Sequence, residues 1–307
     1  MQLGMIGLGR MGGNMAERLL RAGIEVVGTS RTHKTVDEAV ARGISGVYSV
    51  EALVEHLAPP RAVWIMVPAG EPTDDMIRQL SPLLIDGDTI IDGGNSYYKD
   101  TIRRAQELRA GLHLVDVGTS GGVWGLQEGY SLMIGGDDEP VAWLRPIFEA
   151  LAPAPDKGWA HLGPHGAGHF TKMVHNGIEY GMMQALAEGF AIMEKRQDLG
   201  LDLSAVAETW RYGSVVRSWL LDLLAEGLSD NPTLEGIAPW VEDSGEGRWT
   251  VAEAIENDVP APVITLSLIN RLRSRDERNY TERLLAMMRN QFGGHLIKVE
   301  EGHDAEQ

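Results

Sequence analysis

Short apolar runs alternate with amphipathic stretches over the first 165 positions of the chain. The apolar runs read LGMIG, EVVGTS, AVWIMV, TIIDGG, HLVDVG and SLMIGG. They have apolar residues on both faces, which is typical of strands in a parallel sheet. Segments with helical spacing, such as MGGNMAERLLRAG and YKDTIRRAQELRAG, lie between them. The alternation predicts an α/β domain in which helices cover both faces of the sheet.

The strand-like runs end at LGPHGAGH, residues 162–169, and the rest of the chain has helical spacing. The helices that this spacing predicts cover residues 169–196, 203–211, 213–226, 249–256, 261–273 and 276–292. Glycine and proline at positions 163, 164, 166 and 168 suggest a hinge before the first of these helices. We therefore expect an α/β domain over residues 1–165 and an all-helical domain over residues 166–307.

Composition excludes several classes of partner and chemistry. The formal net charge of −17 argues against nucleic acid or an anionic membrane as the main partner, because phosphate backbones are bound by clustered Lys and Arg. The chain has no cysteine, so disulfides, thiolate zinc sites and cysteine nucleophiles are excluded. No apolar run reaches membrane-spanning length. The chain begins MQLGMIGLG, without a basic leader, and we expect it in the cytoplasm.

The first strand is followed directly by GLGRMG, residues 7–12. In this G-x-G-x-x-G pattern Gly7 allows a tight turn, Gly9 lets a pyrophosphate approach the backbone, and Gly12 lets the helix pack on the strand. Glycines are also common in ordinary turns between a strand and a helix. The position inside a βαβ unit that ends at EVVGTSRT favours a dinucleotide and hence a Rossmann-type domain.

The end of the second predicted strand bears on which dinucleotide is bound. NAD sites usually place Asp or Glu there, whereas NADP sites omit the carboxylate and supply Arg for the 2′-phosphate. Here the position reads Ser30, Arg31 and Thr32, and the nearest acid is Asp37. An ordinary surface charge is the alternative interpretation of Arg31. The absence of Asp or Glu at this position and the presence of Arg31 together favour NADP, with NAD as the alternative.

The stretch GHFTKMVHNGIEYG, residues 168–181, places polar side chains among apolar ones at helical spacing. Positions three, four and seven apart share one helix face. The residues on this face are Lys172, His175, Asn176 and Glu179, and Tyr180 borders it. A solvated surface is the alternative, but the glycine-rich approach GPHGAGH favours a binding face. A partly desolvated lysine can lose its proton near neutral pH and act as a base, and a carboxylate on the same face can act as an acid.

With these motifs in place, the chain resembles the decarboxylating 6-phosphogluconate dehydrogenases of the β-hydroxyacid dehydrogenase superfamily. The matching stretches are GLGRMG, IDGGNS at 91–96, GTSGGVWG at 118–125, KMVHNGIEYG at 172–181 and GRWT at 247–250. They occur in the family's order and cover the chain nearly from end to end. The resemblance implies oxidative decarboxylation of 6-phospho-D-gluconate to ribulose 5-phosphate and CO2 with NADP or NAD, in pentose phosphate metabolism or gluconate use.

Matched position by position, the resemblance implies a role for each residue. Lys172 would take the proton of the C3 hydroxyl while hydride passes to the nicotinamide, and Glu179 would protonate C1 after CO2 leaves. No metal is required. The residues that would hold the substrate are Asn95, Ser120, Gly121, Gly122, His175 and Asn176. The residues that would hold the cofactor are Gly7, Leu8, Gly9, Arg10, Met11, Gly12, Ser30, Arg31, Thr32, Val67, Pro68, Ala69 and Asn95.

The resemblance also implies contacts to the substrate phosphate and sugar from the helical domain. These residues are Tyr180, Arg271, Arg289 and His295. Salt bridges on helix surfaces are the alternative interpretation of Arg271 and Arg289. In the family the C-terminal segment reaches the site of a neighbouring subunit, so we expect a homodimer or homotetramer. The helical domain would then serve both substrate binding and oligomerisation.

The chain departs from the long members of the family in two respects. Its 307 residues leave room for one copy of a helical unit that long members carry twice, so it resembles the short form. Its DSGEGRWT segment lacks a lysine of the family's longer loop, a cation that Arg248 would have to replace. Two other interpretations stay open, a dehydrogenase or reductase of another β-hydroxy acid and a regulatory nucleotide-binding protein without turnover. The presence of Lys172 and Glu179 weighs against the latter.

Overall fold

The computed structural model describes residues 1–294 and 296–298 of the chain. It divides into two compact units. Unit 1 comprises Met1–Glu179 and Gly245–Pro260, and unit 2 comprises Tyr180–Ser244 and the residues from Ala261 onward. The boundary between them therefore falls inside one long helix, α8 (Ala167–Glu194).

Unit 1 is built on one sheet, in which eight strands pair among the described residues. Their order across the sheet is β3-β2-β1-β4-β5-β6-β7-β8. The strands are β1 (Gln2–Ile6), β2 (Glu25–Thr29), β3 (Ser45–Gly46), β4 (Ala62–Ile65), β5 (Thr89–Asp92), β6 (His113–Ser120), β7 (Ser131–Gly136) and β8 (Trp159–Gly163). The six predicted strands are all present, and the α/β class is confirmed.

The sheet differs from the prediction at its far edge. β6 and β7 pair antiparallel, whereas a wholly parallel sheet was predicted. Only residues 121–130 connect the two strands, and a parallel crossover requires about a dozen residues or more. The strands β3 and β8 were not predicted. β3 has only two residues, and β8 has alternately half-buried and exposed residues rather than an apolar run.

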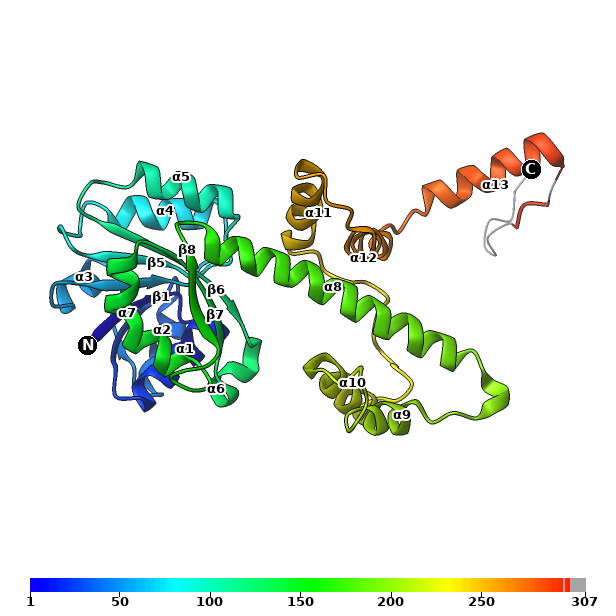
Figure 1. Ribbon diagram of the computed structural model, residues 1–307, viewed down its shortest axis with the longest axis horizontal. Coiled ribbons are helices and arrows are strands. Elements are labelled where there is room, and N and C mark those ends of the chain that lie inside the picture. Colours follow the sequence, from blue (N-terminus) through cyan, green and yellow to red (C-terminus); the bar gives the residue numbers. More distant parts are fainter. Residues whose placement is uncertain (295, 299–307) are drawn as a thin grey trace. The chain divides into compact units, whose positions relative to one another are not determined.

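The helices of unit 1 cover both faces of the sheet (Figure 1). They are α1 (Arg10–Arg21), α2 (His33–Val40), α3 (Val50–His56), α4 (Glu71–Leu80), α5 (Tyr98–Glu107), the 3-10 turn η1 (Gly122–Trp124), α6 (Gly125–Glu128) and α7 (Asp138–Leu151). A further helix of unit 1, α11 (Glu246–Glu256), contacts α8 and α5 instead. Neighbouring residues of each strand point to opposite faces, so the sheet borders two cores. Trp64 packs in the core beneath α1 and α7, and Ile65 packs in the core beneath α3 and α4.

Unit 2 contains only helices among its described residues. They are the remainder of α8, the 3-10 turn η2 (Gln197–Leu199), α9 (Leu203–Trp210), α10 (Trp219–Asp230), α12 (Pro262–Arg273) and α13 (Tyr280–Gly293). A small core around Phe190 and Leu221 joins α8, α9 and α10.

Two of these helices start later than predicted. α10 begins at Trp219 rather than near residue 213, because Gly213 has a positive φ of 74° and Ser218 Oγ accepts a hydrogen bond from Leu221 N. α13 begins at Tyr280 rather than near residue 276, because Asn279 adopts the left-handed conformation with φ 46°.

The compact units are divided differently from the predicted domains, 1–165 and 166–307. The first turns of α8 and the whole of α11 belong to unit 1. Thr250 Oγ1 of α11 donates to Met173 O of α8 at 2.8 Å, and Tyr98 of α5 donates to Glu253 at 2.7 Å. These contacts hold α11 on unit 1, although it lies among unit 2 helices in the sequence.

Within the part of the chain that the structure describes, no helix combines the length and apolarity that a membrane crossing requires.

Candidate active site

The turn between β1 and α1 contains the three glycines of GLGRMG. A Cβ on Gly7 would lie 2.3 Å from Met66 O, and one on Gly12 would lie 2.0 Å from Gly7 O, so close packing requires both glycines. A Cβ on Gly9, by contrast, would meet no atom within 4 Å. The first turn of α1 has no acidic residue, and no side chain caps its N–H groups. An exposed glycine before a free helix N-terminus fits the pyrophosphate of a dinucleotide.

The other residues that were expected to hold the cofactor follow neighbouring strands. The strand order reverses between β1 and β4, and in such sheets ligands bind at the carboxyl ends of the strands beside this switch point. Residues 67–69 follow β4 and Asn95 follows β5, so the structure brings both loops to the strand end that carries Gly7. Asn95 adopts the left-handed conformation, with φ 50°.

The loop after β2 holds the residues that were expected to select the dinucleotide. Thr32 Oγ1 caps α2 by accepting a hydrogen bond from Thr35 N at 3.3 Å. Asp37, the nearest acid, accepts a hydrogen bond from Tyr48 OH at 2.7 Å. Arg31 is exposed and forms no ion pair with any described residue. The loop therefore presents a cation and no competing carboxylate ahead of α2.

The N-terminus of α8 is anchored to the sheet by Asp116, a residue that sequence analysis did not identify. Its carboxylate is fully buried on β6 and accepts hydrogen bonds from Gly166 N at 2.8 Å and His169 N at 2.9 Å. A carboxylate here also interacts favourably with the helix dipole. An Asp within the apolar run HLVDVG was the available signal, because a buried charge requires partners.

This anchor places Lys172 directly over β6. A Cβ on Gly118 would lie 2.3 Å from Lys172 Cβ, so the helix and the strand touch at this point. Lys172 is only 6% exposed. Burial lowers the pKa of Lys172, and the carboxylates of Glu179 and Glu246 partly oppose this shift. The lysine is thus biased toward the neutral form that a general base requires.

Glu246 is a second residue of the site that sequence analysis missed. It is 8% exposed and begins α11, and it is one of the two carboxylates that raise the pKa of Lys172. A Cβ on Gly177 would lie 2.7 Å from Thr250 Cγ2, so α11 packs closely on α8. Glu246 lies 74 positions from Lys172 in the sequence, and no periodicity relates the two residues.

Three of the residues that were expected to hold the substrate contact one another on α8 and at the end of β6. Ser120 Oγ at the end of β6 lies 3.3 Å from His175 Nε2, and His175 Nδ1 lies 3.1 Å from Asn176 Oδ1. Glu179 Oε2 lies 3.8 Å from His175 Nδ1. The predicted polar face of α8 is therefore present, half-buried, and continuous with the turn after β6. That turn contains Gly121 and Gly122, whose φ values of 123° and 52° favour glycine.

The loop containing Asn95 joins this group through its side chain. Asn95 Oδ1 accepts a hydrogen bond from Thr119 N at 3.2 Å. The sequence predicts that Asn95 contacts both the cofactor and the substrate. Its position in the loop after β5, bonded to β6, is compatible with either contact.

The residues expected to bind the phosphate end lie in unit 2. The Arg271 guanidinium of α12 stacks on the Tyr180 ring at 3.6 Å and donates to Glu242 O at 2.8 Å. Tyr180 OH lies 3.2 Å from Ser244 Oγ. Arg289 is exposed on α13, and His295 lies outside the described residues. The structure thus brings Tyr180 and Arg271 together but does not bring Arg289 to them.

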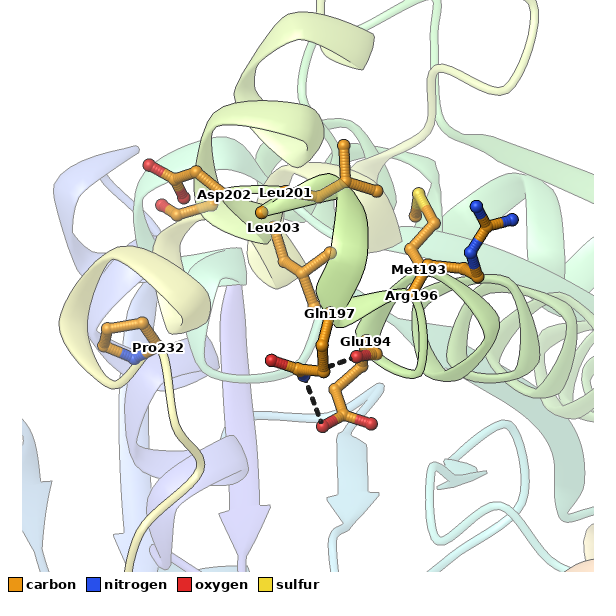
Figure 2. A pocket seen from close by; sticks show the side chains of 10 residues that line it. Met193, Glu194, Arg196, Gln197, Leu201, Asp202, Leu203 and Pro232 are labelled. Atoms are coloured by element: carbon orange, nitrogen blue, oxygen red, sulfur yellow. Dashed lines mark hydrogen bonds between the residues drawn. The ribbon is translucent and has the colours of Figure 1, made fainter.

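A pocket of about 240 Å³ in unit 2 contains none of the predicted site residues (Figure 2). It lies where α8 ends and α9 begins. Gln197 Nε2 donates to Glu194 O at 2.7 Å, and Arg196 forms a bidentate pair with Asp198 at 2.8 Å. Three of its polar side chains, those of Glu194, Arg196 and Gln197, are therefore engaged in local contacts within this segment. Among the described residues no group of three or more His, Asp or Glu side chains is arranged to hold a metal ion.

A glycine-rich nucleotide turn at a sheet switch point, followed by a helix with a buried lysine, defines an NAD(P)-dependent dehydrogenase. Residues 2–163 match the NAD binding domain of 6-phosphogluconate dehydrogenase, and residues 168–304 match the C-terminal domain of 6-phosphogluconate dehydrogenase. The chain belongs to the 6-phosphogluconate dehydrogenase family.

Relatives from three organisms illustrate the similarity. The NAD(+)-dependent, decarboxylating 6-phosphogluconate dehydrogenase of Haloferax volcanii is 43% identical over 299 residues, which cover 97% of this chain and 98% of that protein. The NADP(+)-dependent, decarboxylating enzyme of Bacillus subtilis is 38% identical over 301 residues, covering 93% of this chain and 64% of that protein. The solved 6-phosphogluconate dehydrogenase of Plasmodium falciparum has a TM-score of 0.80 and 29% identity, covering 99% of this chain and 67% of that one.

Proposed function

We propose that the protein oxidatively decarboxylates 6-phospho-D-gluconate to ribulose 5-phosphate and CO2. The observation that carries the proposal is a buried lysine of lowered pKa beside Ser120, His175 and Glu179. Family membership and the names of the relatives support the substrate and the reaction. The pathway, pentose phosphate metabolism or gluconate use, and the cytoplasmic location stay predictions.

We assign the proton transfers to two residues of α8. NADP, when bound, accepts the hydride from C3. Neutral Lys172 takes the proton of the C3 hydroxyl, which leaves a ketone β to the carboxylate. The C1–C2 bond then breaks, and Lys172 returns its proton toward the ketone oxygen to give an enediol. Glu179, about 10 Å further along the helix axis, protonates the carbon that was C2 of the substrate and becomes C1 of ribulose 5-phosphate, while Lys172 takes the proton of the enediol hydroxyl and the ketone re-forms.

The dinucleotide is held by three segments of unit 1 in this proposal. The open space at Gly9 and the uncapped start of α1 receive the pyrophosphate. Arg31 binds the 2′-phosphate of NADP, while residues 67–69 and Asn95 contact the nicotinamide half. NAD remains the alternative, because relatives of both cofactor types share the fold.

One assay tests the reaction against its alternatives. The purified protein is mixed with 6-phosphogluconate and either NADP or NAD, and absorbance at 340 nm is followed together with evolved CO2. We expect both reduced cofactor and CO2. Reduced cofactor without CO2 would indicate another β-hydroxy acid dehydrogenase, for which hydroxyisobutyrate and gluconate are the substrates to try. If neither reduced cofactor nor CO2 forms, the interpretation as a regulatory nucleotide-binding protein is favoured.

We further propose that the protein acts as a homodimer or homotetramer in which Arg289 and His295 reach the site of a neighbouring subunit. Support comes from apolar side chains that are exposed along three helices, as they are on surfaces that contact another protein. They are Ile178, Met182, Met183 and Ile192 on α8, Val263, Leu266 and Ile269 on α12, and Leu284, Leu285, Met287 and Met288 on α13.

Mixing two inactive variants tests this arrangement. Lys172→Met and Arg289→Ala are purified separately, then mixed under conditions that exchange subunits. If Arg289 acts across the interface of a two-fold dimer, half of the sites in a mixed dimer are intact, and random mixing restores about a quarter of wild-type turnover. If Arg289 acts within its own chain, mixing restores nothing.

A further inference from the structure

One buried arginine joins the loops that follow β4 and β5. Arg104 on α5 is 3% exposed, and its guanidinium has partners in three directions. Nη1 donates to Asp92 Oδ2 at 3.2 Å, Nε donates to Asp74 Oδ1 at 2.8 Å, and Nη2 donates to Gly70 O at 3.1 Å. Asp92 ends β5, whereas Gly70 and Asp74 belong to the start of α4.

On the β5 side, the arginine holds the loop that presents Asn95. Asp92 is fully buried, and its carboxylate also accepts hydrogen bonds from Gly94 N at 3.1 Å and Ser96 Oγ at 2.8 Å. Both donors flank Asn95, whose left-handed backbone requires such fixing. Asn95 in turn accepts the hydrogen bond from Thr119 N, next to Ser120.

On the β4 side, the arginine reaches the loop of residues 67–70. Gly70 O accepts hydrogen bonds from Thr73 N and Asp74 N, both at 3.1 Å, as well as from Arg104. Thr73 Oγ1 donates to Pro68 O at 3.0 Å. The two loops also touch directly, because a Cβ on Gly94 would lie 2.7 Å from Val67 O.

We propose that Arg104 is a positioning residue for the reaction, which sets the spacing between the 67–70 loop and Asn95. This inference rests on the proposed function, because it assigns those two loops to the nicotinamide and the substrate. A planar guanidinium satisfies partners in three directions at fixed angles, whereas a lysine ammonium is a single point charge. Arg104 does not touch substrate or cofactor itself. It holds two binding loops in register, and small misplacements at such distances slow catalysis strongly.

The neighbouring arginine offers a matched control. Arg103 donates to the same carboxylate, Asp74, at 2.9 Å, and also to Glu107 at 2.8 Å. It is half-exposed and, among the described residues, it contacts neither Asp92 nor Gly70 O. Arg103→Gln therefore removes a charge from the same cluster and leaves the link between the loops in place.

The experiment compares Arg104→Lys with Arg103→Gln in the full-length protein. Kd for NADP is measured by titration without substrate, and kcat and KM for 6-phosphogluconate are measured at a temperature well below the melting point of each variant. We expect Arg104→Lys to lower kcat by about tenfold to a hundredfold and to raise the Kd for NADP severalfold. Arg103→Gln should leave each value within about twofold of wild type.

A milder variant covers the case in which Arg104→Lys does not fold. Ser96→Ala removes one donor to Asp92 but keeps the arginine, and we expect kcat to fall by about threefold, the effect of one hydrogen bond. A lower melting temperature with unchanged kcat and Kd in the folded variants would overturn the proposal, as would equal losses in Arg103→Gln. The NADP titration separates this outcome from a failure of the proposed function, because it requires no turnover of 6-phosphogluconate.

Discussion

Replacing Gly118 by alanine tests whether the contact between β6 and α8 places Lys172. The added Cβ would lie 2.3 Å from Lys172 Cβ and 2.9 Å from Gly168 O. Carbon atoms in contact are normally about 3.5–4.0 Å apart, so the gap between strand and helix must open by roughly 1.2 Å. Neither neighbouring atom belongs to the end of a flexible side chain, so the backbone of α8 has to move.

The magnitude follows from the size of this displacement. Overpacking of a methyl group costs about 1–3 kcal/mol of stability. A shift of about 1 Å at a reacting group costs on the order of a hundredfold in rate, or about 2.7 kcal/mol of activation free energy. We therefore expect Gly118→Ala to fold, to melt several degrees lower, and to lose about a hundredfold in kcat with 6-phosphogluconate.

The assay pairs initial rates with NADP titration and thermal melting. Two strands separate β6 from β1, which leads into the nucleotide turn, so the pyrophosphate site should persist and the Kd for NADP should change much less than kcat. Gly227→Ala is the matched control, because Gly227 is exposed on α10 and a Cβ there meets no atom within 4 Å. It should keep full activity and gain about 0.5–1 kcal/mol of stability. A Gly118→Ala variant with wild-type kcat would refute the claim that this contact places the lysine.

Three further predictions concern charge. Because Lys172 has a lowered pKa, the unfolded chain binds more protons than the folded chain between that pKa and the ordinary value of 10.5, so stability rises with pH in this window. Lys172→Met should therefore raise the melting temperature at pH 7, and this increase should become smaller as pH approaches 10.5. The same variant should have no turnover, because it lacks the proposed base. An increase in melting temperature that does not change with pH would contradict the lowered pKa. Glu246→Gln removes a carboxylate that raises the pKa of Lys172, so the rising limb of the kcat/KM profile should move to lower pH, and an unmoved limb would count against the assignment. Arg31→Ala should raise KM for NADP about tenfold and leave KM for NAD unchanged, and equal changes for both cofactors would refute its role at the 2′-phosphate.

The alternating pattern of the chain was sufficient to predict most of the fold. Six strands and the long helix α8 follow from apolar runs and helical spacing. The direction of β7 depends on the length of its connection to β6, and a strand pattern does not contain that information. The edge strand β8 has half-buried and exposed residues, so it lacks the continuous apolar run by which the central strands were recognised.

For the candidate site, local periodicity predicted the polar face of α8 but not the groups that support it. Lys172 and Glu179 lie on one helix face because of their spacing alone. Asp116 and Glu246 reach the same site from other elements, and only the folded chain reveals these contacts. Arg104 lies in a segment that resembles an ordinary charged surface helix, and its burial depends on the two carboxylates that surround it.

The hydrogen bonds from the start of α8 to Asp116 have a consequence for how this family can change. The position of Lys172 is determined by the sheet, through Asp116 and Gly118, before the helix leaves unit 1. Insertions, deletions or a duplication among the helices of unit 2 would leave that register intact. The helical region is therefore free to acquire new surfaces and new partners, while the same lysine keeps its place above the strand.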